Sequence, residues 1–169
     1  MSTVEEKIAR LFRMAEKARR RHCNPLSVYT RFSMIPLITI AVWSRVWFGG
    51  WSLLPIGLVL LWIWLNPRVF PEPKSTNNWA SKVVLGEWVW MNRRKVPVPA
   101  HHRLLPSILS LVTLAGFILF IWGLVKLDIY LTALGGMLTI ISKLWFADRM
   151  VWLYEDMKNA TEEYRNWLY

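Results

Sequence analysis

The chain has 169 residues and a mass of 19.9 kDa, and 54% of its residues are hydrophobic, with 12 tryptophans among them. This composition does not fit the solvated surface of a soluble monomer, and it excludes a disordered chain. The formal net charge of +10 beside long apolar runs suits a membrane protein that faces anionic lipid. The single cysteine, Cys23, excludes a disulfide scaffold and a cysteine-rich zinc module.

The first 25 residues predict an amphipathic helix. Ile8, Leu11, Phe12 and Ala15 recur at helical spacing, while the basic residues fall largely on the other faces. A basic amphipathic helix joined to a membrane span is expected to lie on the inner leaflet, with its cations on lipid phosphates. The alternative is that the apolar stripe packs on the chain's own loop.

Four apolar runs are candidates for helices that cross the bilayer, which requires roughly 20 apolar residues. They lie within residues 26–48, 51–65, 104–125 and 128–147. The third run carries no charge, and the fourth, after Asp128 at its start, carries only Lys143. The second run would reach only about 22 Å as a helix, so it must recruit its flanks, thin the bilayer or lie partly buried among its neighbours.

The distribution of basic residues predicts the orientation. Eight lie in residues 1–31 and seven in residues 66–105, whereas the two short connections at 49–50 and 126–127 hold one between them. The positive-inside rule places both termini and the middle loop in the cytoplasm. Short outer turns make antiparallel neighbours, so the four spans should form two helical hairpins.

The predicted architecture is therefore an all-α integral membrane bundle, a single domain in the cell (inner) membrane with amphipathic interfacial helices on the cytoplasmic side. Its parts are the amino-terminal helix (1–25), the first hairpin (26–65), the cytoplasmic loop (66–103), the second hairpin (104–147) and a carboxy-terminal helical extension (148–169). We expect the fourth helix to continue out of the membrane through Tyr169.

The middle loop should contain a helix from about Trp79 to Asn92, preceded by possible N-caps at residues 75–78. Prolines make residues 66–73 and 96–103 rigid and extended on either side. The helix is apolar on almost every face, and Glu87 lies among apolar neighbours. We expect Glu87 to be shielded from water and paired with Arg31, Arg68 or Arg149, since an unpaired buried charge costs several kcal/mol.

Four stretches of the chain resemble an uncharacterised family of short prokaryotic integral membrane proteins with four spans. They are Asn24-Pro25-Leu26-Ser27-Val28-Tyr29-Thr30-Arg31, Asn66-Pro67-Arg68-Val69-Phe70-Pro71-Glu72-Pro73, Trp79-Ala80-Ser81-Lys82-Val83-Val84-Leu85-Gly86-Glu87 and Asp148-Arg149-Met150-Val151-Trp152. The resemblance covers residues 24–156 and implies the membrane class, but no chemistry.

Many of the polar residues should converge at the inner interface on this topology. The candidate ligand-binding residues are Arg31, Asn66, Arg68, Glu87, His101, His102, Asp148 and Arg149. Arginine forks bind phosphate bidentately, so we expect a transport or accessory module that binds an anionic ligand or lipid headgroup. The arginines that would supply these forks are Arg31, Arg68, Arg93, Arg103 and Arg149. Internal salt bridges that only lock the loop onto the bundle are the structural alternative.

Two other functions remain open. One is a membrane-embedded enzyme with an acid/base or metal site at Glu87, His101, His102 and Asp148, and the other is a structural subunit of a larger membrane complex. No HExxH, GxSxG, Walker or Asp-rich Mg²⁺ motif is present, and the potential metal donors lack diagnostic spacing, so no metal ligand is assigned and the sequence does not identify a cofactor. The expected partners are anionic membrane lipids, with other membrane subunits or further copies of the chain as possibilities, and no nucleic acid.

Overall fold

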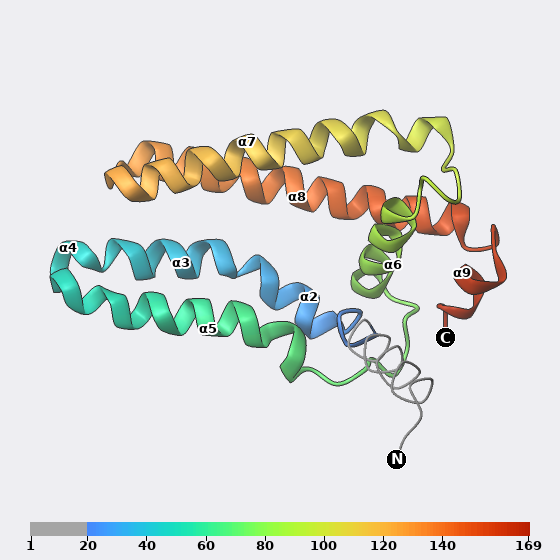
Figure 1. The fold of residues 1–169 in the computed structure, drawn as a ribbon, viewed down its shortest axis with the longest axis horizontal. Helices are drawn as coiled ribbons and strands as arrows, with labels where there is room; N and C mark the ends of the chain where they lie inside the picture. The colour runs from blue at the N-terminus through green and yellow to red at the C-terminus, as the bar shows by residue number, and fades with distance from the viewer. Residues whose placement is uncertain (1–19) are drawn as a thin grey trace, which may run out of the picture.

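The structure, a computed structural model, describes residues 20–169, and every element in this part of the chain is a helix (Figure 1). The elements are α2 (Pro25–Phe32), α3 (Met34–Trp43), α4 (Arg45–Phe48), η1 (Gly49–Ser52), α5 (Leu53–Val69), α6 (Trp79–Met91), η2 (Ala100–His102), α7 (Leu104–Lys126), α8 (Ile129–Met157) and α9 (Glu162–Asn166). The predicted all-α class is confirmed. The predicted amino-terminal helix falls mostly on residues 1–19, which lie outside the described residues.

The long helices lie roughly parallel to one another along the molecule (Figure 1). α8 runs back along α7, and α5 runs back along α3 after the chain turns through α4 and η1. The described residues hold three helical stretches long and apolar enough to cross a membrane, namely Pro25–Asn66, Ala100–Lys126 and Ile129–Met157. By length and composition, the protein is therefore suited to membrane association.

The first of these stretches is broken by serines. α2 ends at Phe32 and α3 begins at Met34, with Ser33 between them, and Ser44 separates α3 from α4. Pro36 has no backbone N–H, so the carbonyl of Phe32 loses the helical hydrogen bond that it would otherwise accept. The backbone N–H of Leu37 restores the pattern by donating to Ser33 at 3.0 Å.

The second predicted span is longer than expected. α5 continues past Asn66 to Val69, and the extended backbone begins only at Phe70, so the prediction of an extended segment from residue 66 is wrong for its first four residues. Pro67 lies in the last turn of α5 and has no backbone N–H, so the helix lacks one hydrogen bond close to its end. At 17 residues, α5 is about 26 Å long.

Small residues bring α7 and α8 into backbone contact. A Cβ atom added to Gly123 would lie 2.4 Å from the backbone nitrogen of Thr132, and one added to Gly135 would lie 2.3 Å from that of Phe120. Thr113 and Ser142 share a hydrogen bond of 2.9 Å between the two helices. Close approach at small residues, with hydroxyl bonds across the interface, is how membrane helices pack without a hydrophobic driving force.

The main apolar core lies where α6 packs across α8, at one end of the molecule (Figure 1). We call this the packed end; it comprises α2, α6, η2, α9 and the adjoining ends of α5, α7 and α8. A Cβ on Gly86 of α6 would lie 1.9 Å from the carbonyl oxygen of Met150, so the two backbones touch there. Asn78 caps α6, as predicted for residues 75–78, by accepting a hydrogen bond from the backbone of Ser81 at 2.9 Å.

The carboxy-terminal segment departs from the prediction of one continuous helix through Tyr169. α8 ends at Met157, and α9 begins after Thr161, whose hydroxyl caps it by accepting from Tyr164 N–H at 3.1 Å. The turn between the helices lets the chain fold back, so that the hydroxyl of Tyr154 donates to the carbonyl of Tyr164 at 3.0 Å. Burial of both tyrosines in the core favours this return over a helix that continues into solvent.

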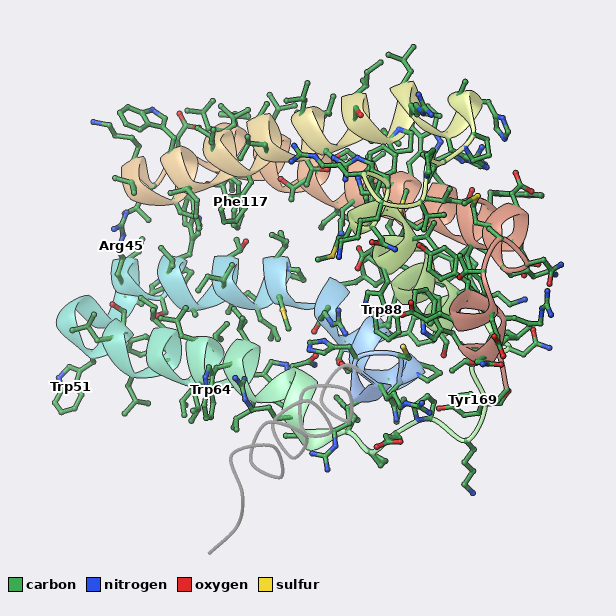
Figure 2. The ribbon with its side chains drawn as sticks, turned by 45° about the vertical axis from the view of Figure 1, so that its right-hand side comes forward. Arg45, Trp51, Trp64, Trp88, Phe117 and Tyr169 are labelled. Carbon is green, nitrogen blue, oxygen red and sulfur yellow. The ribbon has the colours of Figure 1, made fainter. Side chains whose placement is uncertain are left out.

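Away from the packed end, large apolar side chains cover the surface. Figure 2 shows Trp51 pointing outward from η1 and Trp64 pointing outward from α5, whereas Trp88 lies within the packed end. An apolar groove of about 380 Å³ runs between α3 and the α7–α8 pair, with Ile35, Trp43, Phe120 and Met137 among its walls. So wide an exposed apolar surface is typical of helices that face lipid.

Candidate functional site

Asn66 joins α2 to α5 through its buried amide. Its side chain is 0% exposed, its Oδ1 accepts a hydrogen bond from Ser27 Oγ at 3.1 Å, and its Nδ2 donates to Thr30 Oγ1 at 2.6 Å. Both polar atoms of the amide are therefore occupied within the protein. A buried amide with satisfied partners stabilises one arrangement of the two helices.

The guanidinium of Arg31 lies beside this amide and is also held by internal acceptors. Its Nε donates to the carbonyl of Ser27 at 3.1 Å, and its Nη2 donates to the carbonyl of His22 at 3.0 Å and to Ser27 Oγ at 3.2 Å. The same Nη2 lies 3.4 Å from His22 Nδ1, which accepts in the neutral imidazole. Burial lowers the pKa of His22, and the positive charges of Arg31 and Arg68 lower it further, which favours that neutral form.

Glu87 pairs with a residue that the sequence prediction did not name. Lys143 Nζ, on α8, lies 2.7 Å from Glu87 Oε1, so the prediction of a guanidinium from Arg31, Arg68 or Arg149 is wrong. The side chains are 27% exposed for Glu87 and 47% for Lys143, so Glu87 is only partly shielded from water. The crossing of α6 over α8 at Gly86 brings these two charges together, and the spacing of residues in the sequence does not predict where two helices cross.

The other predicted arginines and the aspartate have local partners. Asp148 and Arg149 pair with each other at 3.0 Å. Arg68 donates to the carbonyl of Trp64, four residues earlier, and its guanidinium lies 4.2 Å from the centre of the Trp64 ring. These partners all lie within the residue's own helix, and among residues 20–169 no hydrogen bond or salt bridge joins these three residues to Glu87 or to Asn66.

The two adjacent histidines meet a carboxylate from the end of α8. Asp156 Oδ2 lies 2.8 Å from His102 Nε2 and 3.3 Å from His101 Nε2. His102 is buried, whereas His101 and Asp156 are exposed. Asp156 was absent from the predicted site because its position on the helix does not by itself distinguish it from the neighbouring acidic residues.

A second pocket of about 380 Å³ lies where the loop returns to α7. It is lined by Trp90, Arg93, Pro97, Val98, Arg103 and Ser107. Arg93 Nη1 donates to the carbonyl of Trp90 at 2.7 Å, and Arg103 Nε donates to that of Val98 at 3.0 Å. Within residues 20–169, neither guanidinium forms a salt bridge. Both guanidiniums line this pocket. Among the described residues each donates one hydrogen bond, to a carbonyl, so most of their N–H groups are available to a ligand.

The predicted site residues thus fall into separate groups at the packed end. Asn66 shares one network with Arg31, and His101 joins His102 in another, while Glu87, Arg68 and the Asp148–Arg149 pair each have their own contacts. In the sequence, Glu87 and Lys143 are each an isolated charge within an apolar run, which indicates that each needs a partner but does not pair them with each other.

Comparison with known proteins confirms the predicted membership of an uncharacterised family. No curated protein and no solved structure matches the chain. A model described as a family of unknown function (DUF6653) matches residues 3–167, which is nearly the whole length. The chain therefore belongs to this family of unknown function.

Proposed function

We propose that the protein is a four-span membrane module that binds the phosphate headgroup of an anionic lipid at its packed end, in an accessory or transport role. The observation that carries the proposal is the pocket between Arg93 and Arg103, where two guanidiniums without carboxylate partners among the described residues line one hollow. Guanidinium groups bind phosphate oxygens through paired, charge-assisted hydrogen bonds.

The walls of the pocket also suit a lipid. Trp90 stacks under Arg93, with the guanidinium carbon 4.4 Å from the ring centre, while Pro97 and Val98 add apolar surface. A tryptophan beside a cation is common at the level of lipid headgroups, where the ring stays in the apolar zone and the charge reaches the phosphate. The pocket lies at the start of α7, where an apolar helix would enter the hydrocarbon layer.

Four spans are supported by the reversal of the chain within Pro25–Asn66. This stretch turns at α4 and η1 and returns along its own length (Figure 1), so each half would cross the bilayer once. Arg45 Nη2 lies near that turn and donates to the carbonyls of Leu124 and Val125 at 2.6 and 2.7 Å, which caps the end of α7. The bias of basic residues favours cytoplasmic termini and a packed end on the anionic inner face of the cell membrane.

A lipid-retention experiment tests the proposed function. The full chain is placed in nanodiscs of zwitterionic lipid with a minor fraction of phosphatidylglycerol, and bound lipid is counted by native mass spectrometry after release. At high ionic strength, diffuse surface attraction is screened, so a built site should dominate. Joint replacement of Arg93→Gln and Arg103→Gln should weaken retention by about tenfold or more, because both charge-assisted contacts disappear.

The matched control replaces Arg94→Gln and Lys95→Gln, two exposed cations of the same loop outside the pocket. This control should change retention by less than about threefold. Inorganic phosphate and glycerol phosphate serve as competitors that carry the headgroup charge without acyl chains. Displacement at low concentration by these soluble anions, or equal losses in both double variants, would contradict a lipid headgroup site.

A further inference from the structure

Three potential metal ligands from two distant parts of the chain meet at the packed end. His101 and His102 lie in η2, and Asp156 lies in the last turn of α8. One ligand atom from each residue lies within 4.8 Å of the other two. Both Nε2 atoms lie close to the same oxygen, Asp156 Oδ2, at 2.8 Å from His102 and 3.3 Å from His101.

The two separations from Asp156 Oδ2 are close to those that a tetrahedral zinc ion imposes. Bonds of about 2.0–2.2 Å to nitrogen and oxygen place neighbouring ligand atoms roughly 3.3 Å apart. The His101–Asp156 distance already has this value, and the His102–Asp156 distance needs to lengthen by about half an ångström. His101 and Asp156 are the two exposed members of the cluster, so their side chains have room for this adjustment.

The chemistry of the three donors also suits a metal. Each hydrogen bond to Asp156 requires a proton on Nε2, whereas a divalent cation would take the place of both protons and use the nitrogen lone pairs. Two imidazoles and one carboxylate are a ligand set that zinc and other divalent first-row metals accept. The carboxylate offsets part of the charge of the ion, in a region that is otherwise rich in cations.

The local fold holds one of the three donors, His102, in place before any ion arrives. The side chain of His102 is only 6% exposed, and its backbone N–H donates to the carbonyl of Pro99 at 3.0 Å. Val98, between two prolines, is buried in the core, which anchors the segment that leads into η2. The side chains of His101 and Asp156 are 68% and 48% exposed, so the opposite side of the cluster is open to water.

We propose that His101, His102 and Asp156 form a binding site for one divalent transition metal ion, zinc foremost, with water completing the coordination. The site is distinct from the pocket between Arg93 and Arg103, and it does not depend on lipid binding. Its open side resembles that of zinc sites that keep a position for water or substrate, whereas closed structural sites have four protein ligands.

Cobalt(II) is the probe for this site, because tetrahedral Co²⁺ absorbs visible light far more strongly than the hydrated ion. The full chain is purified in detergent with a tag that lacks histidine, stripped with a chelator and titrated with Co²⁺, and Zn²⁺ is then added. We expect one Co²⁺ per chain with the intense visible absorption, which one equivalent of Zn²⁺ abolishes. His101→Gln and Asp156→Asn, both at exposed positions, should each weaken Co²⁺ binding by at least about tenfold.

The matched control is Asp148→Asn, since Asp148 is a similarly exposed carboxylate on α8 that pairs with Arg149 and lies outside the cluster. This variant should keep the wild-type affinity and spectrum. Circular dichroism of each variant checks that its helices are intact. A wild-type chain without stoichiometric Co²⁺ binding would overturn the proposal. Unchanged affinity in both His101→Gln and Asp156→Asn would do the same, because it would assign the metal to other donors such as His22 or Cys23.

Discussion

Glu87 on α6 and Lys143 on α8 are two charges that each lie among apolar neighbours along their own helix. An isolated charge in such a setting is costly, so the two residues gain most by meeting each other. Lys143 also lies over the Phe146 ring, with Nζ 4.8 Å from the ring centre. The partial exposure of both side chains makes this a half-solvated pair, weaker than the fully buried pair expected from the sequence.

Replacing Glu87 by Gln should lower the free energy of unfolding by about 1 kcal/mol, the upper end for exposed ion pairs, because water already screens part of the interaction. Glu72→Gln, at an exposed position, should have almost no effect. Chemical unfolding in mild detergent measures both variants, and the Lys143→Gln single and double variants complete a mutant cycle. A loss of about 3 to 5 kcal/mol would indicate a fully buried pair instead. No difference from Glu72→Gln would mean that the pair does not contribute to stability.

The helices are held together at glycines where backbones touch. Gly86 places α6 against Met150 of α8, while Gly123 and Gly135 place α7 against α8. The crossing of α6 over α8 forms two ion pairs, since it brings Glu87 to Lys143, and Lys82 to Glu155 at 2.6 Å between charged atoms. A side chain larger than hydrogen at such a point forces two helices apart.

Gly86→Ala and Gly135→Ala should each lower the free energy of unfolding by about 1 to 3 kcal/mol or more, because the new methyl groups would lie 1.9 and 2.3 Å from backbone atoms of α8 and α7. Gly57→Ala is the matched control on α5, where no atom lies within 4 Å of an added Cβ. The control should be neutral or gain up to about 1 kcal/mol from helix propensity. Thermal melting in detergent compares the three variants. Equal melting temperatures would mean that the interhelical contacts at Gly86 and Gly135 are looser than the structure has them.

At the scale of the whole molecule, polar and apolar surfaces separate along the long axis. The main apolar core, the titratable clusters and the Arg93–Arg103 pocket lie at the packed end, whereas the long helices expose apolar side chains to their surroundings (Figure 2). Such a division is typical of a protein whose long helices lie in lipid and whose polar end lies at the level of the headgroups.

This division leads to a test of the four-span topology. In intact cells, a cysteine introduced as Gly50→Cys, at the turn before α5, should react with a membrane-impermeant maleimide added from outside. Lys74→Cys, in the loop before α6, should react only after the membrane is permeabilised. Gly50 has no neighbour within 4 Å of an added Cβ, and the natural Cys23 is 2% exposed, so the unmodified chain supplies the unlabelled background. External labelling at position 74 would contradict cytoplasmic placement of the loop.

The sequence by itself determined the helical class, the apolar runs and the capped helix of the middle loop. These features depend on local periodicity, run length and capping chemistry, all of which act between residues close in the chain. Where a prediction extended a local pattern too far, as at the end of α8, burial of Tyr164 against Tyr154 outweighed it.

Only the tertiary structure decided which charges and imidazoles meet. The partners Lys143 and Asp156 lie more than fifty residues from Glu87 and from the histidines, as 56, 55 and 54 positions separate the bonded residues. Their contacts follow from where α6 and η2 rest on α8, and that placement depends on backbone approach at Gly86 and on core burial. Pairing across such distances is a property of packing geometry, because ionic and polar side chains select whichever partner the packed backbones bring within reach.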